Sequence, residues 1–296
     1  MFAACNNAQI MLYADDSNVF VKSTNLTDLF SLANDVCAQI SKWFNSNRLT
    51  VNYSKSNFIL FFPTSNDECF ISSNNLKIHI NNNALARTNC TKFLGIYLDE
   101  TLNYKHVNCL IKKLNSVNGM VYNRRDYISK QCLKNLYFAL VFSRLQYGIL
   151  IYGFATASTL KPLLICCNKI LRTLQFQNRF SNVKQLYVYY NTLSIFQLHK
   201  LHIGKFVFKS LNCDFLVPDV IREIFALSND NSRKNYDTRL SSTKYLYYSS
   251  QPGYFYSYAY LCCKEWNAIP TEIRTTNSLN NFLKLFKLQL FETWND

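Results

Sequence analysis

The sequence predicts an α+β fold, with short strands and one long helix up to about residue 100 and a mainly helical remainder. Apolar, strand-forming runs on both sides of Asp15-Asp16 predict a β-hairpin over residues 10–20. Further strands are expected near 57–62, 76–80 and 92–98, with turns rich in Asn and Ser between them. Beyond residue 103, apolar residues recur every three to four positions, which is typical of amphipathic helices.

The first helix is expected to begin after Thr24 or Asn25, both good capping residues, and to end near residue 44. Its apolar stripe comprises Leu29, Phe30, Ala33, Val36, Cys37, Ile40 and Phe44. The later helices are predicted at 103–122, 130–147, 157–174, 181–190, 194–211, 216–227, 254–267 and 278–293. A polar stretch from Ser228 to about Leu240 follows the helix at 216–227, and Ile269-Pro270 separates the last two helices. We therefore expect three regions: 1–100, 101–227 and 228–296.

The net charge of +14 is concentrated in the second and third regions. Residues 1–100 carry 7 Lys and Arg against 8 Asp and Glu, whereas residues 101–296 carry 25 against 10. A surface with such an excess binds a phosphate backbone by releasing counterions, so nucleic acid is the expected partner. The alternative is a protein with a general bias toward Asn and Lys and no such partner.

The cysteine and histidine patterns predict no metal centre. The eleven Cys are odd in number and none forms Cys-x-x-Cys, so neither a zinc site nor a disulfide framework is indicated. His199 and His202 share a helix face but have no acidic or thiol neighbour in sequence. Without an evident signal peptide or an uninterrupted apolar span, we expect an intracellular protein, nuclear or cytoplasmic, that does not cross a membrane.

Asp15 and Asp16 are the leading candidates for chemistry. Asp is a poor strand former and costly to bury, so a pair at the tip of a buried hairpin requires a reason. Magnesium supplies one, because it prefers carboxylate oxygens, and adjacent strand residues let one Asp face the metal while the other supports it. The alternative is an ordinary Asp-Asp-Ser-Asn turn.

Three motifs, in order, resemble the reverse transcriptases of LINE-type (non-LTR, jockey-like) retrotransposons. Tyr13-Ala14-Asp15-Asp16 resembles the family's motif C hairpin. Residues 43–56, followed by the apolar run 58–62, resemble motif D. Residues 92–99 resemble the Phe-Leu-Gly primer-grip hairpin. After this hairpin the family has an aromatic residue and a His, matched here by Tyr104 and His106, whose spacing is one residue shorter than in the family. Weaker similarity continues through 143–148, 169–172, 266–270 and 278–284.

This resemblance implies a partial palm at 1–100, made of β-hairpins and a helix, then a helical thumb-like region at 101–227 and a helical extension at 228–296. In the intact element, such an enzyme extends a DNA primer on an RNA template with two Mg²⁺ ions. The family's further metal-binding Asp and its fingers come from upstream of motif C. Since only 14 residues precede Asp15, we expect this chain to be inactive on its own.

The resemblance also assigns roles to residues of the palm. Asp15 would bind the metal with Asp16 as its less essential neighbour, and Tyr13 would face the primer end or the incoming nucleotide. Lys55 would protonate or neutralise the departing pyrophosphate, although it is also compatible with a solvated lysine after a turn.

The other assigned roles concern the grip on nucleic acid. The primer strand would be held by Phe93, Leu94 and Gly95, where Gly95 allows close backbone approach; a bulge packed in the sheet is the alternative. The candidate backbone contacts of the thumb-like region are Lys112, Lys113, Arg124, Arg125, Lys130 and Lys134. Tyr122 and Tyr127 lie near them and either stack on bases or belong to the core.

Three functions remain open at this point. The first is a fragment of a reverse transcriptase, and the second is a non-catalytic remnant that still binds nucleic acid. The third is a relic whose fold persists without a selected activity.

Overall fold

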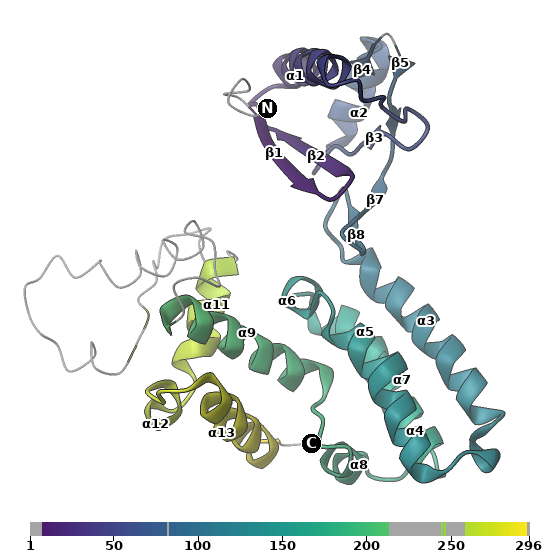
Figure 1. Cartoon of the computed structure of the whole chain (residues 1–296), viewed down its shortest axis with the longest axis vertical. Coiled ribbons are helices and arrows are strands. Elements are labelled where there is room, and N and C mark those ends of the chain that lie inside the picture. Colours follow the sequence, from purple (N-terminus) through teal and green to yellow (C-terminus); the bar gives the residue numbers. More distant parts are fainter. Residues whose placement is uncertain (1–7, 82, 213–243, 245, 247–257, 295–296) are drawn as a thin grey trace, which may run out of the picture. The chain divides into compact units, whose positions relative to one another are not determined.

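The computed structural model describes residues 8–81, 83–212, 244, 246 and 258–294 (Figure 1). Contacts divide the chain into two compact units, residues 1–105 and 106–296. Short strands and two helices make up the described part of the first unit, and helices make up that of the second. This is a mixed α and β architecture. The predicted helix at 216–227 and the predicted boundary after residue 227 lie outside the described residues.

The first hairpin pairs β1 (Ala8–Tyr13) with β2 (Asp16–Val21) in antiparallel register. Tyr13 lies opposite Asp16, so Ala14 and Asp15 form a two-residue turn, and Ala14 has a φ of 51°. The prediction that this hairpin is buried is wrong. Within the described residues no third strand pairs with β1 or β2, and Tyr13 is 65% exposed.

Helix α1 (Leu26–Ser46) covers one part of the first unit, as its apolar stripe predicts. Asn25 caps it by accepting from Asp28 N–H at 2.7 Å. Phe30 is 3% exposed and packs edge-on against Phe58, with ring centroids 6.0 Å apart. Asn34, on the polar side, donates to Lys77 O at 3.0 Å and accepts from His79 N–H at 2.8 Å. The helix is thus fixed through both faces.

The remaining strands are shorter than predicted. The run 57–62 forms only β3 (Asn57–Phe58), parallel to β6 (Ala86–Arg87), and 76–80 only β4 (His79–Ile80), paired with β5 (Asn83–Ala84). Helix α2 (Ser65–Ser73) was not predicted from the sequence. Thr64 and Asp67 begin this helix as a reciprocal capping box.

The strand region predicted near 92–98 is a hairpin of β7 (Cys90–Phe93) and β8 (Ile96–Asp99), the form that the resemblance over residues 92–99 implies. Its two-residue turn has positive φ at Leu94 (45°) and at Gly95 (84°). Positive φ at both positions is what a type I′ hairpin turn requires. Gly95 therefore serves the turn itself, and the proposed bulge is wrong.

Asp99 ends β8 and prepares the start of the next helix. Its carboxylate accepts from Asn103 N–H at 2.9 Å, Lys105 N–H at 3.2 Å and the Thr101 hydroxyl at 3.0 Å. Burial by itself raises the pKa of Asp99, but these donors outweigh it and hold the pKa below its usual value.

The second unit begins with α3 (Lys105–Tyr122), followed by the short 3₁₀ helix η2 (Arg125–Tyr127). The predicted helix 130–147 consists of α4 (Lys130–Leu136), the π-helical segment η3 (Tyr137–Phe142) and α5 (Ser143–Gln146). Gly148, with a φ of 70°, then starts α6 (Ile149–Tyr152). The further helices are α7 (Ala157–Leu174), α8 (Lys184–Tyr189), α9 (Ile195–Asn212), α11 (Tyr258–Asn267), α12 (Thr271–Arg274) and α13 (Leu279–Glu292).

Aromatic side chains form the core where α9, α11 and α13 meet. Trp266 and Phe282 are fully buried, with ring centroids 5.7 Å apart, and Phe282 lies 4.7 Å from Phe208. Gly204 permits this packing, because a Cβ there would lie 2.7 Å from Phe286. No described helix is both long and apolar enough to cross a membrane.

Two half-buried histidines of α9, His199 and His202, lie near α6. His199 lies against Phe154 at 4.5 Å, and a Cβ at Gly153 would lie 2.3 Å from the His199 ring. Burial lowers the pKa of His199 to about 4, with smaller contributions from His202 and Lys200. Burial and then Lys205 lower the pKa of His202 to about 4 as well. Both rings are therefore neutral at pH 7.

We predict that replacing Leu94 with Asn stabilises the β7–β8 hairpin, because Asn tolerates positive φ better than Leu. Amide hydrogen exchange in peptides covering residues 90–99 should slow by roughly 2–5-fold. Leu94→Ala is the control, since it removes the side chain and keeps the unfavourable φ. Equal exchange in the Asn and Ala variants would contradict this account of the turn.

We also predict a loss of stability below pH 6.5 that depends on the α9 histidines. Their folded pKa values of about 4 lie below the unfolded value of about 6.5, so the unfolded chain takes up protons first. The stabilisation is complete above pH 6.5 and is lost as the pH falls toward 4. It amounts to at most about 3 kcal/mol for each ring.

Urea unfolding at pH 7, 6, 5 and 4.5 measures this loss. His202→Gln should flatten the pH dependence, because it removes one titrating ring. The neighbouring charges, Lys205 and the Lys200–Glu265 ion pair (3.5 Å), stay in place. If His202→Gln shows the same pH dependence of the unfolding free energy as the unaltered protein, the histidines are not its cause.

Candidate nucleic-acid interface

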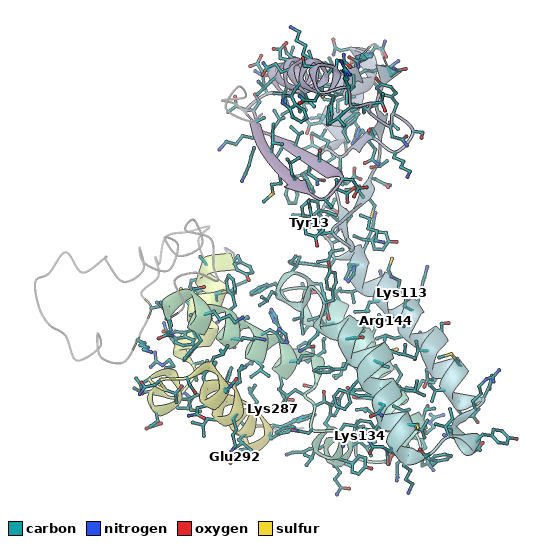
Figure 2. All side chains as sticks on the ribbon, in the orientation of Figure 1. Tyr13, Lys113, Lys134, Arg144, Lys287 and Glu292 are labelled. Atoms are coloured by element: carbon teal, nitrogen blue, oxygen red, sulfur yellow. The ribbon has the colours of Figure 1, made fainter. Side chains whose placement is uncertain are left out.

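The acidic turn of the first hairpin presents its side chains to solvent. Asp15 lies in the turn itself and Asp16 begins β2, and both are exposed. The prediction that both residues are neighbours within one strand is therefore wrong, because only Asp16 belongs to a strand. Tyr13, opposite Asp16, is also exposed, at the end of the hairpin (Figure 2).

The donor chemistry of this turn suits magnesium. Mg²⁺ keeps several waters and is commonly held by one or two carboxylates together with phosphate oxygens. Two exposed carboxylates on a tight turn provide such a partial ligand set. Among the described residues, no group of three or more His, Cys, Asp or Glu side chains is placed to hold a metal ion.

The β7–β8 hairpin packs against the β1–β2 hairpin, which carries the acidic turn. The rings of Phe20 and Phe93 meet edge-on with centroids 6.2 Å apart. Phe20 is four residues from Asp16 along β2, a rise of about 13 Å. Phe93 immediately precedes the Leu94-Gly95 turn. Two segments some seventy positions apart in sequence thus adjoin within one unit.

Lys55 lies in a turn that Asn52 organises. The Asn52 side-chain oxygen accepts from the Lys55 backbone N–H at 3.3 Å and from the Ser54 hydroxyl at 2.7 Å. The Lys55 side chain is exposed. Among the ion pairs of the described residues, none joins Lys55 to Asp15 or Asp16.

Four of the six predicted backbone-contact residues are exposed cations. Lys112 and Lys113 are exposed on α3 between the buried residues Leu110 and Leu114, so they occupy its outer side. Figure 2 labels Lys113. Arg124 follows the end of α3, and Lys130 begins α4. All four are available to a phosphate backbone.

Arg125 has a structural role instead. Its guanidinium lies 4.6 Å from the ring centroids of both Tyr122 and Phe176, and it donates to Thr173 O at 2.9 Å. It therefore ties the end of α3 to the end of α7. Lys134 is similarly engaged, since its ammonium donates to Tyr189 O at 3.3 Å and lies 5.1 Å from the Tyr189 ring.

The structure adds residues that the sequence analysis missed. Phe176 and Phe180, in the connection from α7 to α8, are 45% and 81% exposed. The Arg179 guanidinium lies 4.7 Å from the Phe180 ring. Tyr127 is 91% exposed, so it is not a core residue. The adjacent Arg179-Phe180 pair in a polar stretch was the available signal for these residues.

The described cysteines form no disulfide with one another and range from exposed to buried. Each described cysteine is a free thiol, and Cys166, Cys167, Cys262 and Cys263 are buried. Burial raises the pKa of Cys262 to about 12, so this thiol is unreactive at neutral pH.

Comparisons of the chain with protein-family models, with curated proteins and with solved structures found no match.

Two adjacent arginines give a direct test of this site. Arg125→Met should lower the free energy of unfolding by roughly 1–3 kcal/mol, because it removes the bond to Thr173 O and two ring contacts. Arg124→Met, at the neighbouring exposed position, should change it by less than about 0.5 kcal/mol. Urea denaturation monitors both, and equal effects would contradict the assigned roles.

Proposed function

We propose that this chain is part of a LINE-type reverse transcriptase and that it binds the template–primer duplex. The observation that carries the proposal is the Phe20–Phe93 contact, which joins a Tyr-Ala-Asp-Asp hairpin to a Phe-Leu-Gly hairpin within one unit. A basic helical unit follows in the chain, with exposed lysines on its first helix. This combination suits an enzyme that holds a primer end next to an acidic metal site.

The roles of the residues follow from their exposure and chemistry. Asp15 and Asp16 would hold Mg²⁺ together with a further carboxylate from the upstream palm that the family resemblance implies. The metal, when bound, neutralises phosphate charge. Tyr13 would contact the primer end or the incoming nucleotide, and Phe93, Leu94 and Gly95 would position the primer strand. Lys112 and Lys113 would contact the duplex backbone.

A second candidate function is non-catalytic binding of nucleic acid. It is favoured by the outer side of α3, where Lys112 and Lys113 are exposed and form no ion pair with a described acidic residue. This function needs no metal and no further polypeptide.

Binding of an RNA–DNA hybrid by the full chain should weaken steeply with salt. Fluorescence anisotropy at several KCl concentrations gives the slope of log K against log[salt], to which each phosphate contact contributes about −0.9. Lys112→Ser with Lys113→Ser should make the slope shallower by about 2. Lys42→Ser with Lys77→Ser, at exposed positions of the first unit, should leave it unchanged. Salt-independent binding, or no binding, would refute both candidate functions.

Primer extension tests the catalytic proposal separately. The chain would be combined with a polypeptide that carries the upstream palm and fingers of a LINE-type enzyme, with template, primer, dNTPs and Mg²⁺. Asp15→Asn should reduce extension by roughly 1000-fold or more, because a metal ligand supplies several kcal/mol of transition-state stabilisation. Asp35→Asn, an exposed position on α1, is the control. Extension that survives Asp15→Asn would exclude the metal-binding role.

A further inference from the structure

Exposed aromatic rings and arginines gather at the end of the second unit where α3 and α7 finish. We define this terminal aromatic patch by six residues: Tyr122, Arg124, Tyr127, Phe176, Arg179 and Phe180. The four rings are 56%, 91%, 45% and 81% exposed, in chain order. Exposed aromatic side chains in such number indicate a binding surface.

Two sequence-distant segments are held together to form this patch. Helices α3 and α7 run side by side (Figure 1), and the Cys166 thiol reaches Asn115 Oδ1 at 3.4 Å. At their C-terminal ends, the half-buried Arg125 guanidinium lies 4.6 Å from the ring centroids of both Tyr122 and Phe176 and donates to Thr173 O. The residues around 122–127 and around 176 therefore keep a fixed relation to each other.

The α7–α8 connection is also fixed. The Arg172 guanidinium donates to Ser181 O at 2.9 and 3.1 Å, and Gln177 N–H donates to Arg172 O at 2.9 Å. These bonds close the loop that carries Arg179 and Phe180 back onto the end of α7. The exposed ring of Phe180 is thus presented by a braced loop.

A shallow hollow adjoins the exposed Tyr127 ring. It is lined by Met120, Asn123, Arg124 and Tyr127. Met120 and Tyr127 supply apolar walls, and the Asn123 amide offers both a donor and an acceptor to the edge of a base. Arg124 supplies a positive charge beside them. This lining suits one unpaired base with its phosphate.

The charge around the patch restricts the kind of partner. Residues 120–134 and 169–184 together carry eight Lys and Arg and a single acid, Asp126. A polyanion complements this charge. Within a duplex the base faces are stacked on one another, whereas single strands expose them to aromatic side chains, and stacking tolerates any sequence.

We propose that the terminal aromatic patch binds single-stranded nucleic acid, with bases stacked on Tyr127 and Phe180 and phosphates contacted by Arg124 and Arg179. The proposal rests on the nucleic-acid-binding function proposed above and adds a second site to it. The lysines on the outer side of α3 serve the duplex, and the patch serves an unpaired stretch of template.

The test compares three probes on the full chain by fluorescence anisotropy: a U₂₀ RNA, a dT₂₀ DNA and a blunt RNA–DNA hybrid. Tyr127→Ala and Phe180→Ala should each weaken binding of both single strands by about tenfold, and change hybrid binding by less than twofold. Tyr127→Phe should retain affinity, because stacking requires the ring and not the hydroxyl. The two single strands should bind within about fivefold of each other, since stacking does not read the 2′-hydroxyl.

Tyr147→Ala is the matched control, because Tyr147 is 55% exposed and lies between α5 and α6. If Tyr127→Ala and Phe180→Ala bind the hybrid and keep the single-strand affinity of the unaltered chain, the proposal is overturned and the duplex function stands. An equal loss of hybrid and single-strand affinity would also overturn it. The proposal would also be overturned if the unaltered chain bound neither single strand and the two variants lost self-association, as measured by sedimentation.

Discussion

The Arg125 guanidinium is the contact on which the second unit's candidate binding surfaces depend. It joins the end of α3 to the end of α7 through two aromatic rings and one backbone carbonyl. A cation held this way is unavailable to a ligand, but it fixes the segments that carry the exposed Arg124 and Tyr127. Arg124 is thus available to a ligand whereas the adjacent Arg125 stabilises the fold, and their equal charge does not distinguish the two roles.

The first unit depends on a smaller contact between two hairpins. Phe20 and Phe93 pack edge-on, a geometry that contributes about 0.5–1.5 kcal/mol beyond burial of area. The hairpin that carries Asp15 and Asp16 remains a two-stranded ribbon with much of its apolar surface exposed. Such ribbons gain stability by packing against further structure. This exposure agrees with the proposal that the acidic turn works beside another polypeptide segment.

Helices were predictable where their apolar period is strong and continuous, and α7 was predicted with its observed bounds, 157–174. The bounds of the strands were not predictable, because β3 and β4 are only two residues long and tertiary packing decides which strands they pair with. Helix α2 was missed because it buries only Ile71 and so lacks an apolar stripe. For the site, the Tyr-Ala-Asp-Asp motif identified the exposed Asp15, and the basic residues of a predicted helix identified the exposed Lys112. The different roles of Arg124 and Arg125 depend on Phe176, some fifty positions away, which no local pattern reveals.

The central claim is that the second unit holds nucleic acid on the outer side of α3 and on the terminal aromatic patch. Photocrosslinking with an RNA–DNA hybrid that carries a 4-thiouridine overhang, followed by peptide mapping, tests it most directly. The account predicts crosslinks from the overhang to peptides containing Tyr127 or Phe180, and hybrid-dependent protection of Lys112 and Lys113 from acetylation. Crosslinks confined to the first unit, with both lysines equally reactive in the complex, would contradict it.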